Sequence, residues 1–189
     1  MAFTQSNRQL QVKTPLGPDE LLILRMEARE ELGRLSEFTV DLLSDNEEVA
    51  HDDLLGKPMT VQMDLLDGGK RYFNGFVSQF TQIGHIAYFA HYRATLRPWL
   101  WFLTRTSDCR IFQNKKVPDI IKEIFQDNGF SDFEDRLSGS YREWEYCVQY
   151  RETDFNFVSR LMEQEGIYYH FTHVDGKHTL VLCDGYSSH

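Results

Sequence analysis

The sequence lacks several features that mark common classes of protein. No stretch approaches the about 18 consecutive apolar residues of a membrane helix, so we expect no stable insertion into a membrane. The opening residues MAFTQSNRQL have no apolar core like that of a secretory signal peptide. Basic residues are scarce as well: the net charge is −9, and no basic run exceeds Lys115–Lys116. Because nucleic-acid binding normally requires a basic stripe, we expect no nucleic-acid partner.

Cysteine is also rare and shows no motif. The three residues Cys109, Cys147 and Cys183 are odd in number and form no CxxC pair. This usage predicts reduced thiols and synthesis in the cytosol. Export of such a chain would then depend on a machine that needs no signal peptide.

Motifs of nucleophilic, metal-dependent and phosphate-binding enzymes are missing too. The chain contains no GxSxG, SxxK or HExxH, and its glycines follow turn patterns such as Gly68-Gly69 rather than a phosphate-cradling spacing. From these absences we predict no catalytic residue, no cofactor-binding residue and no metal ligand.

What the chain does contain is 41% hydrophobic and 14% aromatic residues, a composition typical of a globular protein. Its N-terminal half shows short apolar segments between turn signals, which predict antiparallel strands. Their spacing fits a small β-barrel or a β-sandwich. The predicted strands are 8–14, 20–29, 36–43, 59–66, 71–80 and 85–96.

Strand 71–80 is apolar on both sides. In simple alternation Phe73 and Val77 point one way, while Phe76 and Phe80 point the other. A sheet with one face in water carries polar residues on that face, so two apolar faces require cover on both. One face can be the barrel interior. A neighbouring subdomain or subunit, or a helix of the same chain, would cover the other.

Two amphipathic helices are predicted after Pro98. The segment 117–130 has apolar residues at helical spacing and ends at Asn128-Gly129. A second helix can be capped by Thr153 and ended by Gly166. Its apolar residues are Phe155, Phe157, Val158, Leu161 and Met162.

Charged residues around the second helix raise the alternative of a cell-wall hydrolase. At about 1.5 Å per helical residue, Glu152 and Glu165 are roughly 18–20 Å apart, whereas a glycosidase holds its two carboxyl groups within about 10 Å. We therefore interpret the cluster as a solvated helix face with an Arg160–Glu163 pair. The candidate acids and sugar platforms of the hydrolase hypothesis are Glu152, Asp154, Glu163, Trp99 and Trp101.

Two further groups of residues have a structural and a functional interpretation. PWLWFL predicts one helical turn, and its rings Trp99, Trp101 and Phe102 could contact a sugar or a membrane; we favour an apolar anchor under the barrel. The closing hairpin offers a possible metal site from His170, His173, His178 and Cys183. Counting outward from the turn Asp175-Gly176 places only His173 and His178 opposite each other, so we predict a half-exposed histidine pair without metal.

The order of motifs is specific. RYFNGFVSQF is followed by YRATLRPWLWFLTRTSDCRIFQNKKVPDIIKEIF, then by LSGSYREWEYCVQYRETDFNFVSRLMEQEGIYYHF and a hairpin ending in LVLCD. From about Leu10 to Asp184 the chain resembles the N-terminal, phage tail hub-like region of the VgrG spike proteins of type VI secretion systems. That region is similar to the hub of contractile phage tails and to phage late-control D proteins.

The resemblance implies a mixed, mainly β fold. An antiparallel β-barrel would occupy residues 1–105, and a smaller α+β subdomain with two helices would occupy 106–189. It also implies a fragment of a longer hub, because a second barrel and a β-helical needle follow in the family.

The function implied is structural, without catalytic residues in this region. The complete protein would be a homotrimer that docks on an Hcp-type tube ring. Its missing C-terminal part would carry a PAAR-type tip and effector or adaptor proteins. We expect assembly in the bacterial cytoplasm and export to the extracellular space or a target cell. The alternatives are the hub of a phage tail or a tail-associated cell-wall hydrolase.

Overall fold

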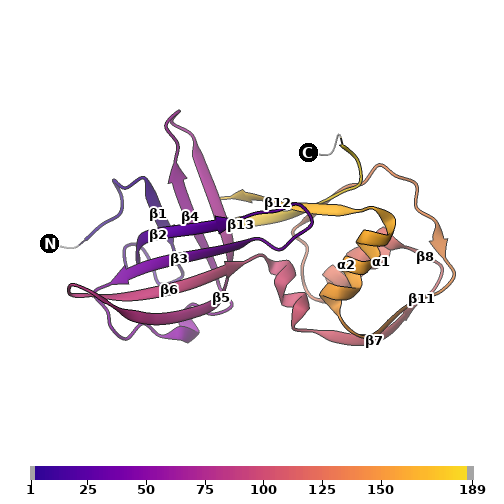
Figure 1. Ribbon diagram of the computed structural model, residues 1–189, viewed down its shortest axis with the longest axis horizontal. Coiled ribbons are helices and arrows are strands. Elements are labelled where there is room, and N and C mark those ends of the chain that lie inside the picture. Colours follow the sequence, from indigo (N-terminus) through magenta and orange to yellow (C-terminus); the bar gives the residue numbers. More distant parts are fainter. Residues whose placement is uncertain (1–2, 187–189) are drawn as a thin grey trace. The chain divides into compact units, whose positions relative to one another are not determined.

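The computed structural model describes residues 3–186 and divides into two compact units (Figure 1). Unit 1 contains the residues up to Glu30, then Leu35–Pro98 and His173–His178, while unit 2 contains Glu31–Arg34, Trp99–Thr172 and the residues from Thr179 onward. Two short segments therefore belong to a different unit from their neighbours in sequence. No helix within residues 3–186 has the length and apolarity needed to cross a membrane.

Unit 1 is built on one antiparallel sheet of six strands that curls into a half-barrel, in the order β1-β4-β5-β6-β3-β2 (Figure 1). A short 3-10 helix, η1 (His51–Asp53), precedes β4. The strands are β1 (Leu10–Lys13), β2 (Leu22–Arg29), β3 (Glu37–Ser44), β4 (Pro58–Asp64), β5 (Lys70–Ile86) and β6 (Phe89–Arg97). The predicted mainly β fold is confirmed.

The concave side of this sheet is an apolar core. Residues two apart in a strand share a face, and this alternation is clear in β3 and β6. The buried residues of these two strands in the core are Phe38, Val40, Leu42, Ala90, Tyr92, Ala94 and Leu96. Phe80 stacks on Tyr92, with ring centroids 5.1 Å apart. Burial of apolar surface contributes about 25 cal/mol per Å², so burial of this set stabilises unit 1.

Strand β5 does not present the two faces that simple alternation predicts. A register shift against β6 lies between Val77 and Gln79, and a bulge of this kind changes which side the following residues face. As a result Phe73, Val77 and Phe80 all belong to the same core. The prediction that Phe80 points away from Val77 is wrong.

The other face of β5 is covered within unit 1. Phe76 lies there and meets the ring of His178 edge-on, at 5.8 Å between centroids. His178 belongs to the segment His173–His178, which we call the hairpin tip. Cover for this face therefore comes from a segment about 100 residues away in the sequence, which strand periodicity could not indicate.

The strand predicted over 85–96 also begins too early. Strand β5 continues to Ile86, and the chain turns at Ala87, which has a φ of 54°. Gly84, the residue before the predicted start of this strand, lies at a second register shift in β5. Tyr88 is consequently 65% exposed at the turn, away from the core that contains Tyr92.

Unit 2 combines two helices with short strands, so the predicted smaller α+β region is confirmed. Strands β7 and β11 form one ribbon and β8 and β10 another; β12, β13 and β9 form a small sheet in which β9 runs parallel to β13. The elements are η2 (Trp99–Thr104), β7 (Ser107–Phe112), β8 (Lys115–Lys116), α1 (Val117–Asp127), β9 (Phe133–Arg136), β10 (Glu143–Trp144), β11 (Cys147–Thr153), α2 (Asp154–Glu165), β12 (Tyr168–Val174) and β13 (Lys177–Cys183).

Both predicted helices are present with the expected ends. Gly129, just past α1, has a φ of 82°, and Gly166 ends α2 with a φ of 71°. The backbone N–H of Asn156 donates to Thr153 Oγ1 over 3.1 Å, which caps α2. The buried side of α2 consists of Phe157, Val158, Leu161 and Met162, together with Asp154. Phe155, placed in the apolar stripe by its spacing, is only half-buried.

The residues PWLWFL form the predicted helical turn, η2, but the anchor lies in unit 2. Trp99 is 1% exposed, and its ring centroid lies 5.0 Å from that of Phe125 and 4.8 Å from that of Phe130. Trp101 and Phe102 are half-buried. Trp99 is therefore a core residue beside α1, and it is not an open platform for a sugar ring.

Candidate functional site

The carboxylates around the second helix, Glu152, Asp154, Glu163 and Glu165, do not form one solvated cluster. Asp154 is buried, at 4% exposure, so the prediction of a solvated position is wrong for this residue. Arg160 pairs with Glu152, at 2.6 Å between Arg160 Nη2 and Glu152 Oε1, instead of the predicted pair with Glu163. Glu165 accepts a hydrogen bond from Trp144 Nε1 over 3.2 Å. These carboxylates thus have separate partners on different elements.

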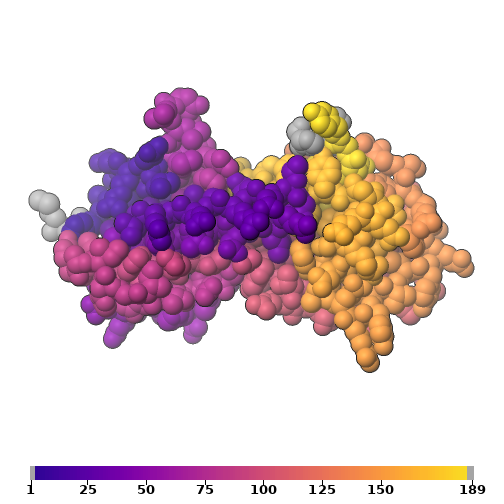
Figure 2. All heavy atoms as spheres, in the orientation of Figure 1, coloured from indigo at the N-terminus to yellow at the C-terminus, as the bar shows by residue number. Residues whose placement is uncertain are grey.

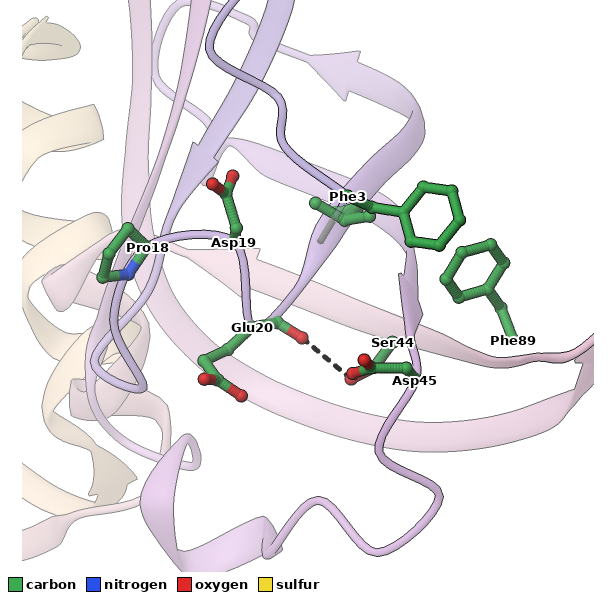
Figure 3. A pocket seen from close by; sticks show the side chains of 8 residues that line it. Phe3, Pro18, Asp19, Glu20, Ser44, Asp45 and Phe89 are labelled. Atoms are coloured by element: carbon green, nitrogen blue, oxygen red, sulfur yellow. Dashed lines mark hydrogen bonds between the residues drawn. The ribbon is translucent and has the colours of Figure 1, made fainter. Parts of the chain in front are cut away.

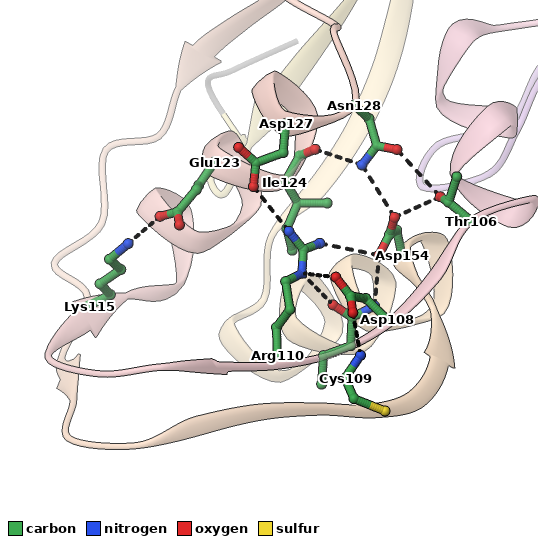
Figure 4. Close-up of polar contacts among 11 residues, drawn as sticks. Thr106, Asp108, Cys109, Arg110, Lys115, Glu123, Ile124, Asp127, Asn128 and Asp154 are labelled. Carbon is green, nitrogen blue, oxygen red and sulfur yellow. Dashed lines mark hydrogen bonds and ion pairs between the residues drawn. The ribbon is translucent and has the colours of Figure 1, made fainter.

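Asp154 is the centre of a polar network at the start of α2 (Figure 4). Its Oδ2 accepts from Thr106 Oγ1 over 2.6 Å and from Asn128 Nδ2 over 3.2 Å. Its Oδ1 accepts from Gln149 Nε2 over 2.7 Å and from Arg110 Nη2 over 3.3 Å. The network joins the ends of α1 and α2 to both strands of the β7–β11 ribbon.

Electrostatics fix the ionised state of Asp154. Burial alone would raise its pKa, but hydrogen bonds from Gln149, Thr106 and Asn128 and the charge of Arg110 hold the pKa below its usual value. A general acid in a glycosidase requires the opposite, a carboxyl with a raised pKa and a free path to the substrate. We therefore interpret Asp154 as a structural carboxylate.

Arg110 balances the negative charge around this network. Its Nη1 donates to Asp127 Oδ2 over 3.0 Å, and its Nε lies 3.2 Å from Asp108 Oδ2, in addition to the contact with Asp154. One guanidinium thus faces three carboxylates (Figure 4). A guanidinium has five N–H donors in a rigid planar arrangement, so it can contact three carboxylates at once better than the ammonium group of a lysine.

The histidines of the closing hairpin lie as the register predicts, but in a different environment. The rings of His173 and His178 are 6.0 Å apart. Both are buried: His178 is 3% exposed and the side chain of His173 is 6% exposed, so the prediction of a half-exposed pair is wrong. On the other side of the hairpin, Cys183 Sγ lies 3.7 Å from His170 Nδ1. Within residues 3–186, no three His, Cys, Asp or Glu side chains are grouped to hold a metal ion.

A buried acid also organises the outer face of the half-barrel. Asp41, on β3, is 2% exposed and lies between Arg25 of β2 and Arg93 of β6. Arg93 Nε donates to Asp41 Oδ1 over 2.7 Å and Arg25 Nε donates to Oδ2 over 2.6 Å. These bonds, that from Arg93 above all, lower the pKa of Asp41 to about 2 although burial opposes them.

A pocket in unit 1 combines carboxylates with aromatic rings (Figure 3). Two of its polar groups are engaged within the chain, because Asp19 Oδ1 accepts from the backbone N–H of Gln5 and Ser44 Oγ donates to the carbonyl of Glu20. Carboxylates beside aromatic rings suit a basic side chain and disfavour an anionic ligand. The lining residues are Phe3, Pro18, Asp19, Glu20, Leu22, Ser44, Asp45 and Phe89.

The β7–β11 ribbon carries an apolar outer face, which we define as Cys109, Ile111, Tyr146, Val148 and Tyr150. The register pairs Val148 with Ile111 and Tyr150 with Cys109, so these side chains lie side by side. Ile111 is 59% exposed, Tyr146 is 52% exposed and Tyr150 is 65% exposed. In Figure 2 the orange part of the chain, to which β11 belongs, lies at the surface. An antiparallel ribbon in water usually exposes polar side chains, so this face has the character of an interface.

A third carboxylate, Asp184, fixes the end of β13. Asp184 accepts hydrogen bonds from the backbone N–H of Ser138 and of Gly139, the latter over 2.6 Å, and from Tyr141 Oη over 2.7 Å. The bond from Tyr141, and then the bonds from Ser138 and Gly139, lower the pKa of Asp184 to about 2 against the effect of burial. A β-carbon on Gly139 would lie 2.8 Å from Asp184 Oδ2, so a larger residue there would displace this carboxylate.

We predict that this carboxylate contributes stability that acid removes. Because its pKa falls from its ordinary 3.8 to about 2 on folding, the contribution is complete above about pH 4 and is lost as the pH falls through about 2. Asp184→Asn should cost roughly 1 kcal/mol at neutral pH, a small value because the group is partly exposed. Urea unfolding at neutral and acid pH, followed by tryptophan fluorescence, measures both effects. Glu163→Gln, on the exposed side of α2, is the control, and an equal loss there would contradict the assignment.

The comparison with known families gives the decisive observation. Residues 29–189 match the family model of the phage tail baseplate hub (GPD). The chain belongs to this family. Over all 189 residues it is 60% identical to the type VI secretion system spike protein VgrG1c of Pseudomonas aeruginosa PAO1, of which it covers 26%. The resemblance to the N-terminal region of VgrG proteins is thus confirmed.

Solved structures agree with this membership. The E. coli c3393 protein, described as a component of the type VI secretion system with structural similarity to the T4 tail proteins gp27 and gp5, superposes with a TM-score of 0.83 and 25% identity. The match covers 95% of this chain and 50% of that one. A Francisella PdpA–VgrG complex matches in fold, with a TM-score of 0.64 and 16% identity over 93% of this chain and 31% of that one. The chain spans 26% of the length of the first curated relatives it matches.

Proposed function

We propose that this chain is the hub part of a type VI secretion spike and acts as a structural docking module. The observation that carries the proposal is the identity of 60% with a spike protein over the entire chain, within the baseplate hub family. The complete protein would form a homotrimer that docks on an Hcp-type tube ring and, through its C-terminal part, carries a PAAR-type tip and effector or adaptor proteins. It would assemble in the bacterial cytoplasm and leave the cell without a signal peptide.

Two structural features support a role in assembly over a role in catalysis. The β7–β11 outer face is uncharged and carries two exposed tyrosines, in line with the depletion of charge and the enrichment of tyrosine at the centres of interfaces. On a chain with a net charge of −9, such a face also minimises repulsion between copies. The most buried candidate acid, Asp154, has a lowered pKa and partners on both oxygens, which does not fit a hydrolase.

The first test is the oligomeric state. We expect the full-length gene product to be a stable trimer in light scattering and the 189-residue chain to be monomeric or weakly associated. In the trimer, Cys109 should react slowly with a maleimide, whereas in the short chain it should react fast. Cys109 is the useful reporter because Cys147 and Cys183 are buried, and burial raises the pKa of both thiols.

A charged residue introduced into the β7–β11 outer face tests whether this face, and not another surface, forms the trimer contact. Ile111→Lys in the full-length protein should lower the trimer fraction, because an unpaired lysine would be desolvated at the interface. Leu66→Lys is the matched control, since Leu66 is a fully exposed aliphatic residue in unit 1. A full-length protein that stays monomeric at high concentration would contradict the hub function. A trimer with freely reactive Cys109 would place the interface elsewhere.

A further inference from the structure

The hairpin tip, His173–His178, is held on unit 1 by a small set of polar bonds centred on Asn74 of β5. The backbone N–H of Asn74 donates to His173 Nδ1 over 3.1 Å. His178 Nδ1 lies 2.7 Å from Asn74 Oδ1. Lys13 of β1 forms an ion pair with Asp175 in the turn of the tip. One asparagine thus meets both histidines.

The orientation of the Asn74 amide determines the protonation of His178. Asn74 Nδ2 donates to Thr60 Oγ1 over 2.7 Å and points toward the carbonyl of Met59 at 3.4 Å. A carbonyl can only accept, so the NH₂ group lies on that side and Oδ1 faces His178. His178 Nδ1 therefore carries a proton and donates it to Asn74, in a bond that persists whether the ring is neutral or charged.

His173 has the opposite requirement. A backbone N–H can only donate, so His173 Nδ1 must accept, and its proton must be on Nε2. An imidazolium carries protons on both nitrogens and cannot accept. A second proton on His173 would place two N–H donors opposite each other at the Asn74 contact. Because the side chain of His173 is only 6% exposed, water cannot reach the Asn74 N–H and take the place of Nδ1 as its acceptor.

We propose that the hairpin tip is a proton-operated latch: it stays closed on β5 while His173 is neutral and opens when His173 takes up a proton at Nδ1. Histidine is the side chain whose charge normally changes between about pH 5 and pH 8, so the latch would respond to mild acid. The tip ends β12 and begins β13, whose remaining residues belong to unit 2. Opening would therefore release the hairpin tip from β5, and the tip is the part of this hairpin that belongs to unit 1.

The other groups around His173 act on a charged ring in different ways. Glu30 Oε1 lies 3.4 Å from His173 Nε2, so its carboxylate stabilises an imidazolium in the closed state and opposes opening. Glu30 is already paired with Arg71, at 2.6 Å, so its attraction for an imidazolium is shared. Phe38 contacts His173 edge-on and offers no acceptor.

Repulsion adds to the lost hydrogen bond. His178, 6.0 Å away, repels the imidazolium once it is charged itself. The Lys13–Asp175 ion pair is exposed at the turn and does not involve His173, so it is not the part of the tip that opens the latch. Protonation of His173 therefore acts on the tip through the buried Asn74–His173 contact.

Nuclear magnetic resonance on the 189-residue chain tests the latch directly. In the neutral state, His173 should show a protonated Nε2 and an unprotonated Nδ1. Between about pH 7.5 and pH 5, the Asn74 amide resonance should shift with the same midpoint as the His173 ring. Hydrogen exchange of residues 172–179, corrected for the intrinsic effect of pH, should rise about tenfold or more over that range while exchange in β3 and β6 stays constant.

Two variants make the test specific. In His173→Asn the side-chain oxygen can take the place of Nδ1 and accept from Asn74 but cannot be protonated, so exchange of the tip should become independent of pH. His85→Asn replaces an exposed histidine that also lies near a carboxylate, Glu47 at 3.5 Å, and should behave like the wild type. If His173→Asn fails to fold, the NMR titration of the wild-type chain still tests the proposal. The proposal is overturned if the Asn74 amide and the tip do not respond while His173 titrates, or if His173→Asn stays as sensitive to pH as the wild type.

Discussion

Replacing Leu161 by alanine should destabilise the protein by about 2–5 kcal/mol, and Phe157→Ala should cost about 3–5 kcal/mol. Both side chains are 0% exposed on the inner side of α2. Phe157 stacks on Phe112 of β7, with ring centroids 5.7 Å apart, so its removal would leave a cavity between helix and ribbon. The loss contains the transfer free energy of the missing atoms and the cost of that cavity.

Urea unfolding followed by tryptophan fluorescence measures this effect, because Trp99, Trp101 and Trp144 all belong to unit 2. Phe155→Ala is the matched control on the same helix, since Phe155 is only half-buried, and it should cost clearly less than Phe157→Ala. A loss below about 0.5 kcal/mol for Leu161→Ala, the size typical of surface substitutions, would show that the buried side of α2 is assigned wrongly.

The helices of unit 2 could be predicted because their signals are local. The cap at Thr153 and the left-handed end at Gly166 lie within the helix sequence itself, and both form in the structure. The assignment of Phe155 to the buried stripe failed for a related reason. Periodicity identifies an apolar side of a helix, but the packing against β7 and β11 decides which residues at its margin are covered.

In the half-barrel, errors arose where strand pairing departs from simple alternation. The shift between Val77 and Gln79 depends on how β5 aligns with β6, which is a property of two strands and not of one. The same holds for the turn at Ala87, a residue that gives no turn signal in the sequence. Gly84 lies at a bulge of β5, and because glycine marks bulges as well as turns, the sequence does not locate the start of β6 there.

The polar centres could not be predicted because their members are far apart in sequence. Asn74 meets His173 and His178 across about 100 residues, and Asp154 meets Thr106 across 48. From the sequence alone, such side chains are predicted to lie at the solvent-exposed surface, because isolated charged residues are mostly exposed. Only the fold supplies the donors that make their burial possible. The order of motifs, by contrast, indicated the family directly.

Asp154→Ala should cost about 3 kcal/mol, which is comparable to the loss of a core leucine. The substitution removes the acceptor that Arg110, Gln149 and Thr106 share, and of these donors Gln149 is fully buried. Removing one member of such a network costs more than its net contribution, because the remaining donors keep their desolvation penalty. Asp154→Asn should cost less, since its side-chain oxygen can still accept, although it no longer balances the charge of Arg110.

The pH dependence of Asp154 has a definite sign. Its pKa is lowered on folding, so the carboxylate contributes stability above its ordinary pKa of 3.8, and this contribution decreases as the pH falls below about 4. The wild type should therefore lose stability in acid more steeply than Asp154→Asn. Unfolding curves in urea at several pH values measure the two slopes.

Glu152→Ala is the control that separates a buried network from a surface pair. Glu152 bonds Arg160, whose side chain is 48% exposed, so this change should cost at most about 1 kcal/mol. The same series decides between structural and catalytic roles for Asp154. A catalytic carboxylate is kept for its reactivity, and its removal often leaves stability unchanged or increased. An Asp154→Ala variant as stable as the wild type would therefore contradict the structural role and return this residue to the hydrolase hypothesis.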